Sequence, residues 1–281
     1  MRLLSAACLL LAGVGLPAHA TQIFNDDFES EFVGANPANP PWNIRVESGP
    51  ATIEVTNTDL FGSLSHALAI LNGAGNSSNN VRVGTTTTNR GVFQTYSFDL
   101  YDTDLGNEGN DGFFFRILTA TANDVQSASI NAIFNLGFAD GAIGGVSGLY
   151  SVGQAQHIDI VANSGGTSVS YLGGAQTIDP FSADVWVDGQ LVLSNFAALN
   201  TGPMGGMGFF IANTSRQNLI VDNVMKFEGA DVQPVSHPAA VLLLMLGTVG
   251  LIARRSGGSA HLKRLAWQAP LTLQRHLIAY Q

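Results

Sequence analysis

The sequence has a single cysteine, Cys8, among its 281 residues. Cys8 lies within an N-terminal apolar segment that we expect to be removed during export. The mature chain would then contain no thiol. This excludes disulfides, cysteine nucleophiles and cysteine-ligated metals from its chemistry.

Basic residues are also scarce, with 12 Lys and Arg against 21 Asp and Glu and a formal net charge of -9. All 21 acidic residues lie between Asp26 and Asp231, where six bases occur, so this segment carries a formal charge of -15. Because nucleic-acid binding requires a basic surface, a nucleic-acid partner is excluded. An acidic chain repels anionic polymers, so we expect any polysaccharide partner to be neutral.

Helical periodicity is missing between the two ends of the chain, and the 32 glycines follow no regular period, which excludes collagen and coiled coils. Short runs with strand character alternate instead with clusters of Asn, Gly, Asp, Ser and Thr. This pattern predicts an all-β ectodomain over residues 21–230, folded as a two-sheet antiparallel β-sandwich. The clearest expected strands are 52–56, 113–118, 157–161 and 184–188.

One β-hairpin is specified by its turn, Asp188-Gly189, which lies between two apolar runs. A two-residue turn pairs Trp186 with Leu191 and Val185 with Val192. Both faces of the two runs carry apolar residues, so we expect the hairpin to be interior to the sandwich and Trp186 to belong to the core.

The first 20 residues have the pattern of a secretory signal peptide. A basic residue, Arg2, precedes the apolar stretch 3–16, and Ala18 and Ala20 form a cleavage site of the A-x-A type. We therefore expect export through the inner membrane. A lipoprotein signal at Cys8 is the alternative.

Near the other end, residues 239–253 form an uncharged run of 15 residues followed by Arg254 and Arg255. As a helix this run is about 22 Å long, short of the roughly 30 Å hydrocarbon core. The arginine pair fits a cytoplasmic stop. We expect one short transmembrane anchor over 238–255, and a buried core helix is the alternative.

The segment before that run, Val235, Ser236, His237 and Pro238, together with the apolar helix and the arginine pair, resembles a PEP-CTERM sorting tail. The resemblance implies a Gram-negative exported protein that an exosortase processes at the motif, then a location at the cell surface or outside the cell. Residues 231–237 would be the linker that carries the motif. The tail 256–281 would be a basic cytoplasmic segment, either an interfacial helix or an extension without a role.

Residues 24–30, Trp42 and 220–228 resemble the terminal strands of carbohydrate-binding jelly rolls, and 185–193 with 207–211 resembles the concanavalin A-like fold. The resemblance implies a jelly roll in which the first and last strands pair. Asp26–Glu29 would then lie near Asp222–Glu228.

Catalytic patterns are missing from the sequence. It has neither the Glu-x-Asp-x-x-Glu strand of laminarinase-like enzymes nor a Gly-x-Ser-x-Gly nucleophile motif. Glycoside hydrolysis needs two paired carboxyl groups, and Glu29 and Glu31 could share a strand face. We interpret them as surface acids on an edge strand. His66 and His157 stand isolated in the sequence, so we expect a protein that is not an enzyme.

Calcium is the candidate cofactor, because it binds carboxylate and amide oxygens. One candidate site is the loop with Asp102, Asp104, Asn107 and Asp111. A second, implied by the carbohydrate-binding resemblance, consists of Asp27, Glu29 and Asp222. Solvated acidic loops without metal are the alternative.

Aromatic side chains that stack on sugars are few in the ectodomain. Trp42 lies in a proline-rich stretch and is either an exposed stacking platform or an internal packing residue. We interpret the protein as a non-catalytic cell-surface or matrix protein that contacts neutral exopolysaccharide. The alternatives are a polysaccharide hydrolase or lyase of jelly-roll fold and a purely structural surface protein.

Overall fold

The computed structural model describes residues 20–38, 42–47, 51–62, 64–72, 80–103, 112–119, 131–212, 217–230 and 232. The expected signal segment before residue 20, the sorting motif, the apolar run with its arginine pair and the basic tail lie outside these residues. Among the residues that are described, no helix is long and apolar enough to cross a membrane.

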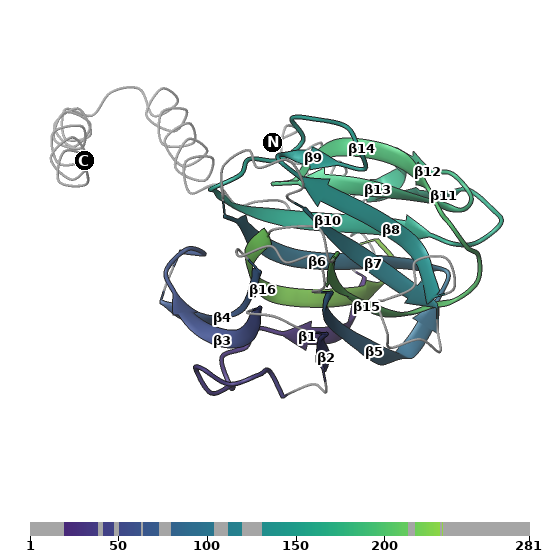
Figure 1. Ribbon diagram of the computed structural model, residues 1–281. Helices are drawn as coiled ribbons and strands as arrows, with labels where there is room; N and C mark the ends of the chain where they lie inside the picture. Colours follow the sequence, from purple (N-terminus) through teal and green to yellow (C-terminus); the bar gives the residue numbers. More distant parts are fainter. Residues whose placement is uncertain are drawn as a thin grey trace, which may run out of the picture. The chain divides into compact units, whose positions relative to one another are not determined.

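The larger of the two sheets is antiparallel and contains eight strands (Figure 1). Its strands follow one another across the sheet as β14 (Gln190–Ala197), β13 (Ser182–Val187), β10 (Ala155–Asn163), β6 (Phe93–Asp102), β16 (Gln217–Glu228), β4 (Ser65–Asn72) and β3 (Thr52–Thr58). The eighth strand, β1 (Thr21–Asp26), pairs with the second half of β16, whereas β4 pairs with its first half. The first and last strands of the sandwich therefore pair, as the jelly-roll resemblance predicted.

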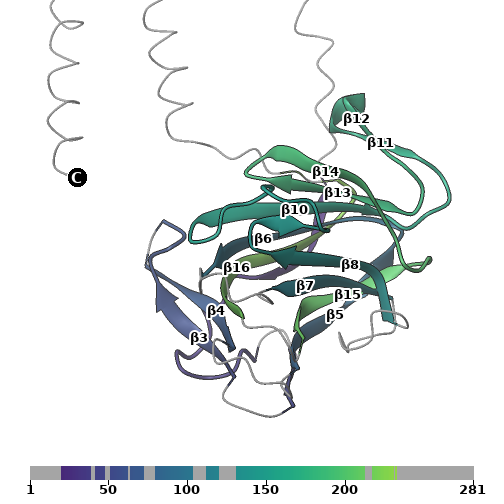
Figure 2. The same ribbon diagram turned by 45° about the horizontal axis from the view of Figure 1, so that its top comes forward.

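The smaller sheet has six strands and faces the larger one, as Figure 2 shows. Its order is β2 (Asn43–Val46), β5 (Val81–Gly91), β15 (Met204–Ile211), β7 (Phe113–Thr119), β8 (Ala132–Ala139) and β9 (Ala142–Ile143). These two antiparallel sheets confirm the predicted all-β sandwich. Each of the four clearest expected strands lies within an observed one, apart from Asp188, which belongs to a turn.

Aromatic rings fill the space between the sheets. The ring of Phe98 in β6 lies 4.8 Å from that of Phe115 in β7 and 5.3 Å from that of Phe209 in β15, measured between centroids. Side chains alternate between the two faces of a strand. Because Phe98 points inward, its neighbours Ser97 and Asp99 lie on the outer face of the larger sheet.

A small hairpin covers one end of that outer face. It consists of β11 (Val169–Tyr171) and β12 (Gln176–Ile178), joined through a 3-10 turn at Leu172–Gly174. Tyr171 and Ile178 pack against Val161 of β10 and Trp186 of β13. Trp186 is therefore buried, as predicted, but in this outer cluster rather than between the sheets.

The predicted β-hairpin is present, with two differences in detail. Asp188 and Gly189 have φ of 50° and 72°, as a type I′ turn requires, and Trp186 pairs with Leu191. A bulge between Val185 and Trp186 shifts the next pair, so that Val185 faces Leu193 rather than Val192. The expectation that both strands are interior is wrong for β14, which is the edge strand of its sheet.

Lys226 is the one lysine of the acidic segment, and it lies fully buried between the sheets. Its ammonium donates hydrogen bonds to Thr87 Oγ1 at 2.7 Å, to the Asn89 carbonyl at 3.0 Å and to the Gly205 carbonyl at 3.3 Å. Burial lowers the pKa of Lys226 to about 8. Lys226 thus links strand β16 to the smaller sheet. Its positive charge does not lie on the outer surface of either sheet.

Candidate functional site

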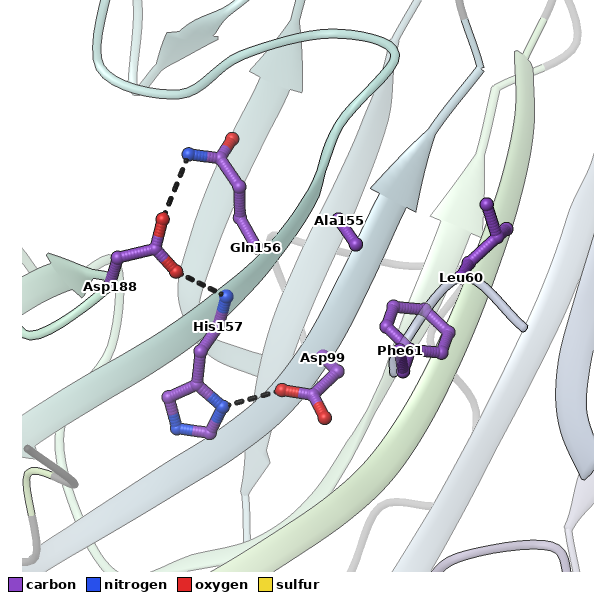
Figure 3. A pocket seen from close by; sticks show the side chains of 7 residues that line it. All are labelled: Leu60, Phe61, Asp99, Ala155, Gln156, His157 and Asp188. Atoms are coloured by element: carbon purple, nitrogen blue, oxygen red, sulfur yellow. Dashed lines mark hydrogen bonds and ion pairs between the residues drawn. The ribbon is translucent and has the colours of Figure 1, made fainter. Parts of the chain in front are cut away.

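An open pocket of about 260 Å³ lies on the outer face of the larger sheet (Figure 3). The sheet supplies part of its lining, and two connections supply the rest. The lining residues are Leu60, Phe61, Asp99, Ala155, Gln156, His157 and Asp188. Figure 3 shows Asp188, Gln156, His157 and Asp99 in succession, with Leu60 and Phe61 beyond Asp99.

Four polar side chains meet on the outer face because β6 and β10 pair in a fixed register. His157 faces Asp99, and Asp159 faces Ser97. The imidazole Nδ1 of His157 lies 2.6 Å from Asp99 Oδ1, and its Nε2 lies 3.2 Å from Asp159 Oδ1 and 3.0 Å from Ser97 Oγ. His157 therefore bridges two carboxylates, one partly exposed and one, Asp159, fully buried.

The charge of His157 follows from these contacts. Burial would lower the pKa of His157, but the hydrogen bonds to Asp159 and Asp99 and their negative charges raise it to about 10. The ring is consequently an imidazolium at neutral pH. Both of its nitrogens carry protons and donate hydrogen bonds.

Asp188 enters the pocket from the turn between β13 and β14. Its Oδ1 accepts a hydrogen bond from the backbone N–H of His157 at 2.9 Å, and its Oδ2 accepts one from Gln156 Nε2 at 3.3 Å. The Asp-Gly pair that makes the hairpin turn thus also places a carboxylate at the site. The sequence identified Asp188 as a turn residue and gave no sign that its side chain would line a pocket.

The other side of the pocket is apolar. Leu60 and Phe61 belong to the connection between β3 and β4, where the backbone N–H of Leu60 donates to Thr58 Oγ1 at 3.1 Å. The pocket therefore combines oxygen acceptors on one side with an apolar wall on the other.

A second group of carboxylates borders the site. Asn223 Nδ2 donates to Asp99 Oδ2 at 2.7 Å, and the neighbouring Asp222 accepts from Asn223 N at 2.7 Å. Burial, with added repulsion from the charges of Asp99 and Glu29, raises the pKa of Asp222 to about 6. Glu29 in turn accepts a hydrogen bond from the backbone N–H of His66 at 3.0 Å.

The predicted calcium residues are only partly brought together. Glu29 and Asp222 lie near each other, as the pairing of the terminal strands implied, while Asp27 accepts a hydrogen bond from the Glu29 backbone at 3.3 Å. The described residues hold no group of three His, Cys, Asp or Glu side chains arranged for a metal ion. Calcium binding here stays a prediction.

In the other calcium candidate, Asp104, Asn107 and Asp111 lie outside the described residues. Asp102 is buried, and its carboxylate accepts hydrogen bonds from Tyr150 Oη at 2.5 Å and from Gln217 Nε2. The side chain of Asp102 therefore belongs to an internal hydrogen-bond network.

Trp42 is an internal packing residue and not an exposed stacking platform. Its side chain is 8% exposed, its indole N–H donates to Asp26 Oδ2 at 2.7 Å, and its ring stacks on that of Phe28 and meets the edge of Phe24. With its ring packed in this way, Trp42 leaves no free face for a sugar.

Glu29 and Glu31 do not lie on an edge strand, because β1 ends at Asp26 and a turn follows. Glu31 is buried and accepts a hydrogen bond from the backbone N–H of Ala38 at 3.0 Å. The interpretation of both as surface acids is therefore wrong for Glu31.

Sequence reasoning also missed the role of His157, which it treated as isolated. Its partner Asp99 is 58 residues away in the sequence. One local signal was present: both strands carry polar residues at alternate positions, Ser97 and Asp99 in one and His157 and Asp159 in the other. Two such strands paired side by side form a polar strip.

No family model matches this chain, and neither does any curated protein. Among the solved structures similar to it is domain 4 of AbnA, a GH43 extracellular arabinanase from Geobacillus stearothermophilus in complex with arabinotriose. It is 13% identical over 77% of this chain and 96% of that chain, with a TM-score of 0.42. The cellulose-induced protein Cip1 is 14% identical over 74% of this chain and 100% of that chain, with a TM-score of 0.48. A family 11 carbohydrate-binding module from Clostridium thermocellum, in complex with a β-1,3-1,4-mixed-linked tetrasaccharide, is 13% identical over 77% of this chain and 99% of that chain, with a TM-score of 0.38.

Proposed function

We propose that this is a non-catalytic polysaccharide-binding protein and that the pocket on the outer face of the larger sheet holds a sugar unit. The observation that supports the proposal is the lining of the pocket. Asp99, Asp188 and Gln156 offer oxygens to sugar hydroxyls, and Leu60 and Phe61 offer an apolar surface to the C–H face of a sugar ring. Concave sites with a few convergent polar groups beside apolar side chains are typical of ligand binding.

The contact between Ser97, His157 and Asp99 favours a second candidate, a hydrolase. Its distances are those expected for a nucleophile, a base and an orienting acid. Two features argue against that role. Ser97 is fully buried, and a histidine whose pKa is raised to about 10 is already protonated at neutral pH, so it does not accept the serine proton.

Export and anchoring complete the proposal. They rest on the signal-peptide pattern of residues 1–20 and on the PEP-CTERM-like tail from Val235 to Arg255, which lie outside the described residues. We propose that the sandwich is carried to the cell surface while the apolar run holds the chain in the membrane, and that an exosortase processes the motif. Detection of the intact C-terminus in the extracellular protein by mass spectrometry would contradict that cleavage.

The binding proposal is tested by a glycan array probed with the purified full-length chain, followed by calorimetric titration of the oligosaccharides retained. Phe61→Ala removes the apolar wall and is expected to weaken binding about tenfold, which is about 1.4 kcal/mol. Phe32→Ala is the matched control, because Phe32 is 83% exposed and does not line the pocket.

A chain that binds no glycan, or equal losses in the two phenylalanine variants, would contradict the proposal. A reducing-sugar assay on the same polysaccharides separates binding from hydrolysis. We expect no product from the wild-type chain. Product that disappears in Ser97→Ala would establish the hydrolase instead.

A further inference from the structure

The pocket has more negative charge than its one cation balances. Asp99 and Asp188 line it, and Asp159 Oδ1 lies 3.2 Å from His157 Nε2. The imidazolium of His157 is shared between Asp99 and Asp159. No lysine or arginine belongs to the described residues that line the pocket.

Three cations among the described residues are buried away from this face. Lys226 is buried between the sheets. Arg116 and Arg82 are 4% and 2% exposed and belong to β7 and β5 of the smaller sheet, where the guanidinium of Arg116 lies 4.0 Å from the centroid of the Phe210 ring. The positive charges of these three residues are therefore held away from the carboxylates of the pocket.

The hydrogen-bonding groups show the same imbalance. Gln156 Nε2 donates one of its two N–H groups to Asp188, and Asn223 Nδ2 donates one of its two to Asp99. A carboxylate has about four acceptor positions, and each oxygen of Asp99 and Asp188 is used by one of the hydrogen bonds described above. The pocket thus retains acceptor positions on these two side chains, while each of the two amide groups has one of its two N–H donors engaged.

A ligand that fits this arrangement brings donors and a positive charge. An ammonium group supplies three donors and one charge. Partial burial strengthens its attraction to carboxylates relative to an ion pair in bulk water. The raised pKa of Asp222, to which the neighbouring charges of Asp99 and Glu29 contribute, is consistent with negative potential along this border.

We infer that the pocket selects an amino sugar with a free ammonium group, such as a deacetylated hexosamine unit of a polysaccharide, over a neutral sugar. The inference rests on the proposed function and identifies the class of sugar. The ammonium faces the carboxylates of the pocket, and the ring lies against Phe61 and Leu60. A volume of about 260 Å³ equals that of about nine water molecules at ~30 Å³ each, enough for about one sugar unit.

The experiment compares two oligosaccharides with the same backbone, a β-1,4-linked glucosamine tetramer and its fully N-acetylated counterpart. Both are titrated calorimetrically into the full-length chain near pH 6 at low salt. We expect the free amine to bind at least about tenfold more tightly, with the preference shrinking as salt screens the charges. In Asp188→Asn the ratio of the two affinities should fall toward one. Asp179→Asn, an exposed acid outside the pocket lining, should keep it.

Tetralysine serves as a cation without a sugar ring. If it binds as tightly as the glucosamine tetramer, the bulk acidity of the chain explains the result and the inference is overturned. Equal or tighter binding of the N-acetylated tetramer also overturns the inference, but it leaves the proposed polysaccharide binding in place. If neither tetramer binds and the glycan array is also blank, the proposed function itself fails.

Discussion

The two ends of the outer face of the larger sheet use similar residues in different ways, although β10 and β13 run through both. At the covered end, beneath the β11–β12 hairpin, Asp184 accepts hydrogen bonds from Tyr171 Oη at 2.7 Å and from the Asn195 backbone at 2.8 Å. At the open end, Asp99 and Asp188 line a pocket. Asp184 is buried, so its carboxylate serves only the fold, whereas Asp99 and Asp188 accept as many internal hydrogen bonds and still face an open pocket that a ligand can enter.

The difference comes from the hairpin and not from the strands themselves. Trp186 and Val161 have the hairpin residues Tyr171 and Ile178 as packing partners, so the covered end is apolar and buried. His157 lies further along the same face of β10, where its ring contacts the polar side chains of Ser97, Asp99 and Asp159. We therefore assign stability mainly to the covered end, and the proposed ligand binding to the open end.

The largest effect that separates the two ends is expected from Trp186→Ala. Loss of this ring leaves a cavity beneath the hairpin and should lower the free energy of unfolding by about 3–5 kcal/mol. Urea denaturation measures the loss. Oligosaccharide affinity of the folded variant should stay unchanged. A loss below about 1 kcal/mol would contradict the assignment of stability to the covered end.

His157→Gln removes the cation of the open end and leaves the charges of the buried Asp159 and of Asp99 without compensation. We expect a loss of about 3 kcal/mol near neutral pH. The pKa of His157 is raised in the folded chain, so its stabilisation is fully present below the unfolded pKa of about 6.5 and is lost as pH rises through about 10.

The difference in stability between wild type and His157→Gln should therefore shrink from about pH 7 to about pH 10, which urea denaturation at a series of pH values can follow. Lys226 is present in both proteins, so its own titration cancels in the difference. A difference that is independent of pH would show that His157 is neutral in the folded chain.

Asp222→Asn should change the free energy of unfolding less than His157→Gln does, and in the opposite direction. The folded chain holds the Asp222 proton up to about pH 6, above the ordinary value of 3.8, so stability falls as pH rises through that interval. At pH 7 the variant should be more stable by about 1 kcal/mol, because it removes a charge that burial and its neighbours disfavour. Asp179→Asn should leave stability nearly unchanged. A destabilised Asp222→Asn chain would contradict this account of the open end.

Local sequence determined the parts of the fold that could be predicted. The Asp188-Gly189 turn fixed a hairpin and its first pairs, because both residues adopt positive φ at low cost. Alternation identified strands such as 52–56, which lies within β3. The bulge next to Val185 was missed because it depends on packing between strands rather than on the turn.

The candidate site could not be predicted because it depends on distant pairing. His157 and Asp99 meet only through the register of β6 with β10, which no local pattern sets. Trp42 was open to two interpretations for the same reason, since its burial depends on Phe24 and Phe28 of another segment. Residue types indicated which chemistry was available, and the tertiary arrangement decided where it was assembled.

The most direct test of sugar binding at the open end is a nuclear magnetic resonance titration of the full-length chain with an oligosaccharide retained on the array. The imidazole signals of His157, assigned with the His157→Gln variant, report on the pocket, and the indole N–H signal of Trp186 reports on the covered end. We predict that the His157 signals shift in a saturable way while the Trp186 signal stays in place. A shift of the Trp186 signal with unchanged His157 signals would contradict the account.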